Sequence, residues 1–129
     1  MLIADNLFYT KDHEWAKIDA DSATIGITDF AQNALGDITF VDLPKLGARL
    51  KQSQCYATVE SVKAASDVYA PLTGEVEKVN TELINHPELV NKSAYELGWF
   101  AVIKIADLAE KNKLMTSAEY KAYVQGLSK

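Results

Sequence analysis

Two short runs of alternating residues, separated by a few small residues and one lysine, constrain the fold of this chain most strongly. The run 56–62 reads YATVESV and places Ala57 and Val59 on one face, as the period of two in a strand requires. Tyr56 falls on the opposite face together with the polar residues. A second run, 67–70, reads DVYA and is stopped by the proline, threonine and glycine that follow. The pattern predicts two strands joined as a hairpin.

The lysine at the predicted hairpin tip is Lys63, in the segment 60–67 with the letters ESVKAASD. Its neighbours are small, so they permit a tight turn and leave room for an enzyme to approach the amine. An exposed lysine is protonated at neutral pH and is a poor nucleophile, so acylation of Lys63 requires a separate enzyme. Without further information, such a lysine is more often a solubilising surface charge than a covalent handle.

The letters around Lys63 favour the covalent handle. The segment 60–71, ESVKAASDVYAP, resembles the lipoyl-lysine segment of the glycine cleavage system H protein family. Other blocks similar to that family follow in order: His13-Glu14-Trp15, the segment 23–29 (ATIGITD) with Ala31-Gln32, Leu35-Gly36-Asp37, Phe40-Val41-Asp42-Leu43-Pro44, Gly74-Glu75-Val76, Asn80, Leu89-Val90-Asn91, Tyr95 and Gly98-Trp99. The resemblance runs from about Tyr9 to Ile105, and a match of this length is far more specific than an isolated SVKA.

The resemblance implies a carrier rather than an enzyme, with lipoate attached covalently to Lys63 and no catalytic residues. In this family a pyridoxal-phosphate glycine decarboxylase loads the aminomethyl group of glycine onto the lipoyl arm. A tetrahydrofolate-dependent aminomethyltransferase unloads it, and a flavin (FAD) dihydrolipoamide dehydrogenase reoxidises the arm. A lipoyl-attaching enzyme is the fourth implied partner. Tethering would raise the effective concentration of the arm at each docked enzyme.

The resemblance also implies that the loaded arm folds into a cleft on the carrier. A cationic amine there needs carboxylate or carbonyl partners, and we expect Glu14 and Asp67 to supply the carboxylates. On a strand, the adjacent His13 and Glu14 would point to opposite faces and could not form an acid-base or metal-binding pair. If the two residues lie in a turn, strand alternation does not apply to them. Phe30 departs from the family pattern, because many relatives carry histidine at this position.

Other classes of protein fit less well. Biotin carriers place methionine on both sides of the modified lysine, where this chain has Val62 and Ala64. Lipoyl domains of the 2-oxoacid dehydrogenases lack the HEW and GIT blocks. Within the family, an H-like lipoyl donor or redox relay not dedicated to glycine cleavage remains an alternative, as do a small enzyme built around His13, Glu14 and Ser61 and an unmodified structural protein.

Composition and charge indicate the domain organisation of the chain and exclude several classes of partner. With 129 residues, 48% hydrophobic, the chain suits one domain over 1–129, with its core at about 9–105 and a helical tail at about 107–127. A net charge of -5 argues against nucleic-acid binding.

No membrane span or leader pattern is present, so we expect a cytoplasmic protein. The single cysteine, Cys55, excludes an intrachain disulfide and is expected to be a half-buried strand residue. The histidines show no metal-site spacing, so no metal is expected.

The remaining segments predict a β-rich fold, all-β or α+β, which the resemblance refines to the barrel-sandwich hybrid of lipoyl and biotinyl carriers. A short helix is expected over 29–35, capped by Asp29 with Gln32, ended by Gly36, and with Ala31, Ala34 and Leu35 facing inward. Further strands are expected at 15–18, 23–28, 38–43, 75–79 and 99–105. A C-terminal amphipathic helix is expected to begin with a Thr116 and Glu119 capping box and to use Tyr120, Tyr123, Val124 and Leu127 as its apolar face.

Overall fold

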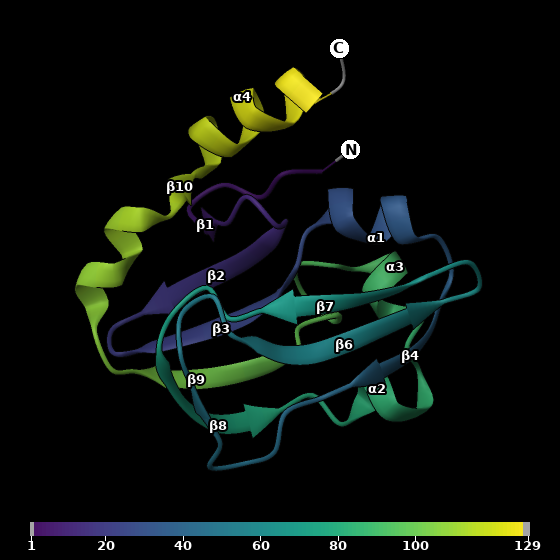
Figure 1. The fold of residues 1–129 in the computed structure, drawn as a ribbon, viewed down its shortest axis with the longest axis horizontal. Coiled ribbons are helices and arrows are strands. Elements are labelled where there is room, and N and C mark those ends of the chain that lie inside the picture. The colour runs from purple at the N-terminus through teal and green to yellow at the C-terminus, as the bar shows by residue number, and fades with distance from the viewer. Residues whose placement is uncertain (1, 128–129) are drawn as a thin grey trace.

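A computed structural model describes residues 2–127, and within that range the chain forms two antiparallel sheets that enclose the core (Figure 1). The larger sheet has the strand order β10-β1-β2-β3-β9-β8-β5, and the smaller one has the order β4-β6-β7. The strands are β1 (Phe8–Tyr9), β2 (Glu14–Asp19), β3 (Ser22–Ile27), β4 (Ile38–Asp42), β5 (Arg49–Leu50), β6 (Cys55–Ser61), β7 (Ala65–Tyr69), β8 (Gly74–Val79), β9 (Ala101–Ile105) and β10 (Met115–Thr116). The β-rich fold class is thereby confirmed.

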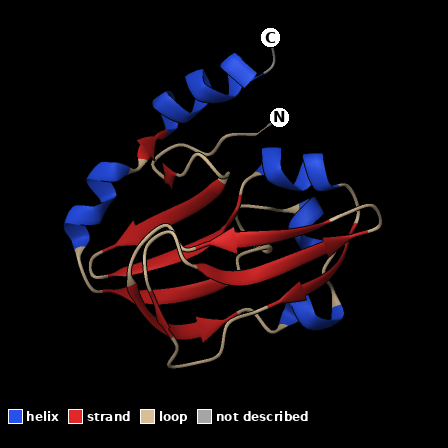
Figure 2. Cartoon of the chain, viewed as in Figure 1, coloured by secondary structure: helices blue, strands red, loops and turns tan. Residues whose placement is uncertain are grey.

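Helical segments are short and lie around the rim of the sheets (Figure 2). They are α1 (Asp29–Leu35), α2 (Glu82–Asn85), α3 (Leu89–Lys92), the 3-10 helix η1 (Leu108–Lys113) and α4 (Ser117–Leu127). The sequence pattern did not predict α2 or α3, which have four residues each. The tail expected to be helical over 107–127 is interrupted by β10, which pairs with β1. No helix among residues 2–127 has the length and apolarity needed to cross a membrane.

The main core lies between the two sheets. Strand alternation explains it: Ile25 and Ile103 point inward from the larger sheet, and Val59 and Val68 point inward from the smaller one. All four are at most 3% exposed. Burying each such side chain contributes about 2 kcal/mol relative to leaving it in water. The hairpin that carries Lys63 is therefore one half of a packed sandwich, which gives the tip a fixed base.

A second apolar cluster fastens the C-terminal helix to the sheet. The rings of Tyr9 on β1 and Tyr120 on α4 stack with centroids 4.4 Å apart. The predicted capping box is confirmed, since Thr116 N donates to Glu119 Oε1 (2.9 Å) and Glu119 N donates to Thr116 Oγ1 (3.3 Å). Of the predicted apolar face, Tyr120 and Val124 are buried, whereas Leu127 is 48% exposed and does not belong to it.

The start of α1 differs from the prediction. Thr28, not Asp29, is the N-cap, because its extended backbone and hydroxyl let Oγ1 accept from Ala31 N at 3.2 Å. Asp29 is the first helical residue and instead accepts from the Gln32 side chain at 2.7 Å. The helix ends as predicted at Gly36, whose φ of 81° lies in the region that favours glycine.

Two exposure predictions for these elements were wrong. Ala34 of α1 is exposed, while the other two residues expected to face inward, Ala31 and Leu35, pack against the core. Strand β6 contains a register shift between Cys55 and Ala57. The shift places Tyr56 in the core beside Ala57 and leaves Cys55 exposed instead of half-buried.

Candidate functional site

The hairpin tip that carries Lys63 is held by hydrogen bonds at its base. Ser61 N donates to Ala64 O (2.8 Å), and Ser61 Oγ accepts from Ala64 N (3.1 Å). A serine hydroxyl that bonds the backbone of its own turn stabilises a tight reversal. Val62 N also donates to Asp37 O (3.1 Å), which ties the tip to the segment before β4. The position of Lys63 is therefore set by two independent attachments.

The side chain of Lys63 is exposed, and it forms no ion pair with any residue in the range 2–127. Its aliphatic stem lies over the end of α1, because a Cβ atom added at Gly36 would be 3.4 Å from Lys63 Cε. A Cβ atom at that distance would make only an ordinary van der Waals contact, so it is the φ of 81°, not the lysine stem, that favours glycine here. The amine is free to be modified, since no carboxylate of the described chain holds it.

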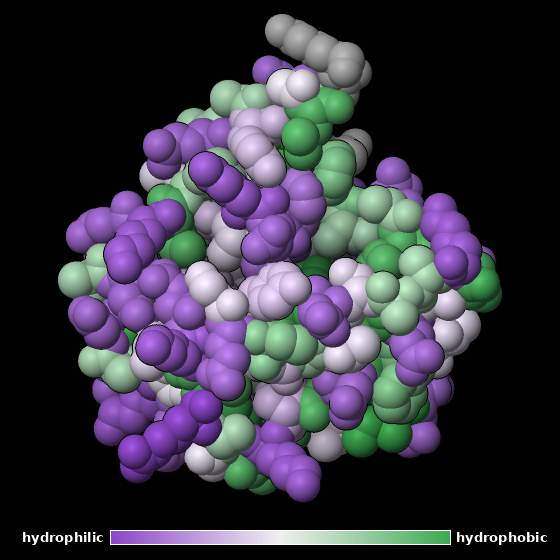
Figure 3. Space-filling model, in the orientation of Figure 1, coloured by the Kyte–Doolittle hydropathy of each residue, from purple (hydrophilic) through white to green (hydrophobic). Residues whose placement is uncertain are grey.

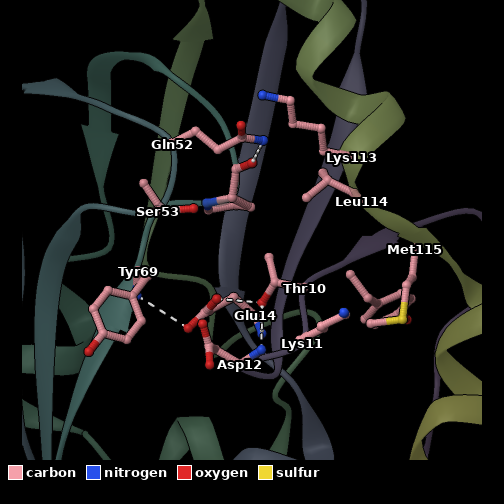
Figure 4. Close-up of a pocket in the computed structure, with 13 residues that line it drawn as sticks. Thr10, Lys11, Asp12, Glu14, Gln52, Ser53, Tyr69, Lys113, Leu114 and Met115 are labelled. Carbon is pink, nitrogen blue, oxygen red and sulfur yellow. Dashed lines mark hydrogen bonds between the residues drawn. The ribbon is translucent and has the colours of Figure 1, made fainter.

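At the other end of β7, a pocket surrounds Glu14 (Figure 4). The pocket has a volume of about 230 Å³ and is lined by β1 and the following turn, by the loop 52–53, by the end of β7 and by the segment 113–115. Glu14 itself is only 2% exposed. Its carboxylate accepts from Thr10 Oγ1 and, at 3.2 Å, from Tyr69 N. The first residue of β2 is thereby joined to the last residue of β7.

The electrostatics of the pocket centre on that carboxylate. Burial raises the pKa of Glu14 from 4.5 to about 7, although the hydrogen bonds from Thr10 and Tyr69 act to lower it and the charge of Asp12 adds to the rise. Near neutral pH, Glu14 therefore exists as a mixture of neutral acid and carboxylate. A cation that enters the pocket would favour the carboxylate form, which makes Glu14 a natural partner for an amine.

Asp67 lies between the tip and the pocket. It is exposed on β7, opposite Thr58 of β6, and it is not one of the residues that line the Glu14 pocket. Because side chains alternate along a strand, Asp67 shares a face with Tyr69, which does line the pocket. The structure therefore does not bring the two predicted carboxylates into one cavity. It places Asp67 along the strand that leads from Lys63 to Glu14.

His13 belongs to a different cluster. It precedes β2 with a φ of 67°, so it lies in a turn and the strand argument about His13 and Glu14 does not apply. Its Nδ1 atom is 2.8 Å from the hydroxyl of Tyr120, and its ring stacks on Phe30 with centroids 4.2 Å apart. Burial lowers the pKa of His13. The departure at Phe30 thus affects this aromatic cluster, since Phe30 does not line the Glu14 pocket.

Several pocket residues were not predicted from the sequence. Thr10 and Tyr69 bond Glu14 directly, and Lys113, Leu114 and Met115 form a wall contributed by the C-terminal tail (Figure 4). Strand alternation could have indicated Tyr69, two residues after Asp67. Nothing local in the tail indicates that it reaches this pocket. Among residues 2–127, no group of three His, Cys, Asp or Glu side chains is arranged to hold a metal ion.

Comparison with known proteins gives a consistent result. The family model described as Glycine cleavage H-protein matches residues 7–127. The glycine cleavage system H protein of Halothermothrix orenii is 51% identical over 125 residues, which cover 97% of this chain and 98% of that protein. The corresponding protein of Bradyrhizobium diazoefficiens is 57% identical over 115 residues, covering 89% of this chain and 94% of that protein.

A solved structure is also similar. The crystal structure of a glycine cleavage system H protein from Mycobacterium marinum superposes with a TM-score of 0.85 at 34% identity, and the match covers 93% of this chain and 97% of that one. The two sheets and the C-terminal helix described above therefore form the barrel-sandwich fold of lipoyl carriers, as the sequence resemblance implied.

Proposed function

The chain belongs to the glycine cleavage H-protein family, whose role is lipoyl shuttling, and we propose that Lys63 is the residue of this chain that carries the lipoyl group. The single observation that carries the proposal is the free amine of Lys63 on a hairpin tip with two hydrogen-bonded attachments. Lipoate, when attached there, supplies a cyclic disulfide that accepts nucleophiles.

The residues present fit such a group. Ala64 and Ala65 follow Lys63 and leave space for a modifying enzyme. An eight-carbon acyl chain on a lysine extends roughly 14 Å from the backbone, at about 1.3 Å of reach per bond. The strand from Ala65 to Tyr69 spans about 13 Å. An arm on Lys63 is therefore long enough to run along most of β7, toward the Glu14 pocket at the end of that strand.

We propose that the Glu14 pocket shelters the amine that the arm carries. The Glu14 carboxylate would accept hydrogen bonds from the ammonium group, and Thr10 and Tyr69 N hold that carboxylate in place. Asp67 would attract the same positive charge during its passage along β7. The enclosing wall at 113–115 would limit the access of water to the carbon beside the amine.

The partners follow from this carrier role. We propose that the chain is not itself an enzyme and that it visits the pyridoxal-phosphate decarboxylase, the tetrahydrofolate-dependent aminomethyltransferase and the FAD-dependent dihydrolipoamide dehydrogenase of the glycine cleavage system. A lipoyl-attaching enzyme would act first. Cytoplasmic location remains a prediction. We also propose one carrier domain, because neighbouring residues Trp15 and Ala16 belong to the two hydrophobic clusters and join them.

The carrier role is tested by glycine-dependent exchange of bicarbonate, catalysed by a purified glycine decarboxylase with the lipoylated chain as cosubstrate. We expect saturable exchange with the wild-type chain and with the matched control Lys78→Arg, whose lysine is also exposed. Lys63→Arg should give none. Exchange of equal rate with Lys63→Arg would refute the assignment of Lys63.

A further inference from the structure

We propose that exposed apolar residues beside the hairpin tip form the surface that the lipoyl-attaching enzyme recognises. This surface, called the tip patch, consists of Phe40, Val62, Ala64, Ala65 and Ile84. The inference rests on the proposed function, in which Lys63 is the attachment site. It goes further by assigning recognition to residues that neither carry the lipoyl group nor line the Glu14 pocket.

The tip patch combines the most exposed apolar side chains of this region. Phe40 is 47% exposed, Val62 is 72% exposed and Ile84 is 60% exposed. Phe40 on β4 lies opposite Glu60 on β6, which in turn lies opposite Ala65 on β7. Helix α2, which carries Ile84, packs against β4. Figure 3 shows hydrophobic surface over the hairpin end and below it, over β4 and α2, at the right of the molecule.

These side chains are not needed for the core. Leu83, next to Ile84 on α2, is fully buried and anchors that helix, whereas Ile84 points outward. Val41, next to Phe40 on β4, is 2% exposed and fills the core between the sheets. Exposed apolar side chains that cluster at one place indicate an interaction site more often than isolated ones do. The tip patch can therefore be changed without removing core contacts.

Charge around the tip patch defines the chemistry of the partner. Asp37, Asp42, Glu60 and Asp67 are all exposed around the apolar residues. Within 36–44 and 58–68, Lys63 is the only basic residue of the sequence. The complementary surface is therefore an apolar centre with a basic rim, and a pocket in it must accept the lysine side chain. Complementary charge of this kind raises association rates and fixes orientation.

The short length of the lysine side chain indicates that the lipoyl-attaching enzyme, and not one of the other partners, binds the tip patch. A lysine side chain extends only about 6 Å from its backbone. An enzyme that acylates Lys63 must therefore contact the hairpin tip, where Val62, Ala64 and Ala65 of the tip patch adjoin Lys63 in the chain. Enzymes that react with the far end of the arm act roughly 14 Å from the backbone. They have no need to cover the same residues.

The test measures kcat/KM for lipoylation by a lipoate ligase, with ATP and lipoate, using the unmodified chain as substrate. Two patch variants are used, Phe40→Thr and Ile84→Gln, which retain strand and helix propensity. Leu97→Thr and Leu46→Gln are matched controls, because these leucines are 60% and 66% exposed away from the tip. We expect each patch variant to lose about tenfold in kcat/KM, as for a residue central to an interface. The controls should match the wild type.

A third patch variant, Phe40→Leu, keeps an apolar side chain and should retain most of the rate. Thermal unfolding of every variant separates loss of recognition from loss of the fold. Equal kcat/KM for patch variants, controls and wild type would overturn the tip patch and leave Lys63 as the lipoyl site. A wild-type chain that the ligase does not modify would instead overturn the proposed function and the tip patch together.

Patch variants that have been fully lipoylated with excess ligase provide a further check. We expect their glycine–bicarbonate exchange with the decarboxylase to equal that of the wild type. If the exchange falls while the rate of lipoylation does not, the surface serves the decarboxylase and the inference is overturned. The kcat/KM for lipoylation should also fall as salt is added, because salt screens the attraction between the acidic residues around the tip patch and a basic rim on the ligase. A kcat/KM independent of salt would contradict that basic rim.

Discussion

Replacing Glu14 by glutamine is expected to stabilise this protein at alkaline pH. The unfolded state releases the Glu14 proton near pH 4.5, whereas the folded state retains it until about pH 7 because the side chain is buried. Between these values the folded state binds more protons, so the free energy of unfolding falls as the pH rises. This contribution to stability is complete below pH 4.5 and is lost by the time the pH has passed 7.

The magnitude follows from the two pKa values. The interval from 4.5 to about 7, at 1.36 kcal/mol for each pH unit, corresponds to roughly 3 kcal/mol. Glutamine keeps an oxygen that can accept from Tyr69 N but changes the hydrogen bond with Thr10. The net gain expected for Glu14→Gln at pH 8.5 is therefore about 1–3 kcal/mol.

Urea unfolding at pH 5 and pH 8.5 measures this effect. Glu14→Gln should exceed the wild type clearly at pH 8.5 and by much less at pH 5. Asp12→Asn is a suitable control, because Asp12 also lines the pocket but is exposed, and its effect should be small at both pH values. A gain of the same size at both pH values, or a loss at pH 8.5, would refute the account of Glu14 as a buried, ionisable group.

A carboxylate that lowers stability at neutral pH calls for a functional reason. Buried ionisable groups with raised pKa values are concentrated at functional sites, where the chemistry requires them. In the proposed carrier, Glu14 meets the amine on the arm, and the ammonium group would pair with its carboxylate. Glu14→Gln should therefore stabilise the protein and, at the same time, weaken binding of the amine that the arm carries.

Three further predictions concern the framework around the site. Tyr120→Phe removes the hydroxyl that contacts His13 and should lower the free energy of unfolding by about 1–2 kcal/mol in urea titrations, more than the control Tyr123→Phe. Asn91→Ala removes a bond of 2.9 Å to Gly36 O and should cost about 2 kcal/mol by the same assay. Because burial lowers the pKa of His13, stability in the Glu14→Gln background should fall as the pH drops below 6.5, and it should fall less when His13→Gln is added.

Much of the fold could be predicted because short-range patterns agree with the tertiary structure. Alternation predicted β6 and β7, and the Thr116 and Glu119 pair predicted the start of α4 correctly. Errors arose where a local irregularity overrode the pattern. The register shift in β6 buried Tyr56 and exposed Cys55, and no residue letter at that place signals an extra residue in the strand.

The candidate site was only partly visible in the sequence. Lys63 stands in a continuous segment, so its neighbours could identify it. The surroundings of Glu14 are assembled from β1, the end of β7 and the segment 113–115, which are far apart along the chain. Their meeting depends on strand β10 pairing with β1, a contact of two residues with no clear pattern. Asp67 was expected in the same cavity, but the structure places it along β7 instead.

Attachment of the lipoyl group to Lys63 is tested most directly by the intact mass of the chain after incubation with a lipoate ligase, ATP and lipoate. The wild-type chain should gain one lipoyl group and Lys63→Arg should gain none, with peptide mapping placing the addition on Lys63. No gain by the folded wild-type chain with a ligase that modifies another carrier, or an equal gain by Lys63→Arg, would contradict it.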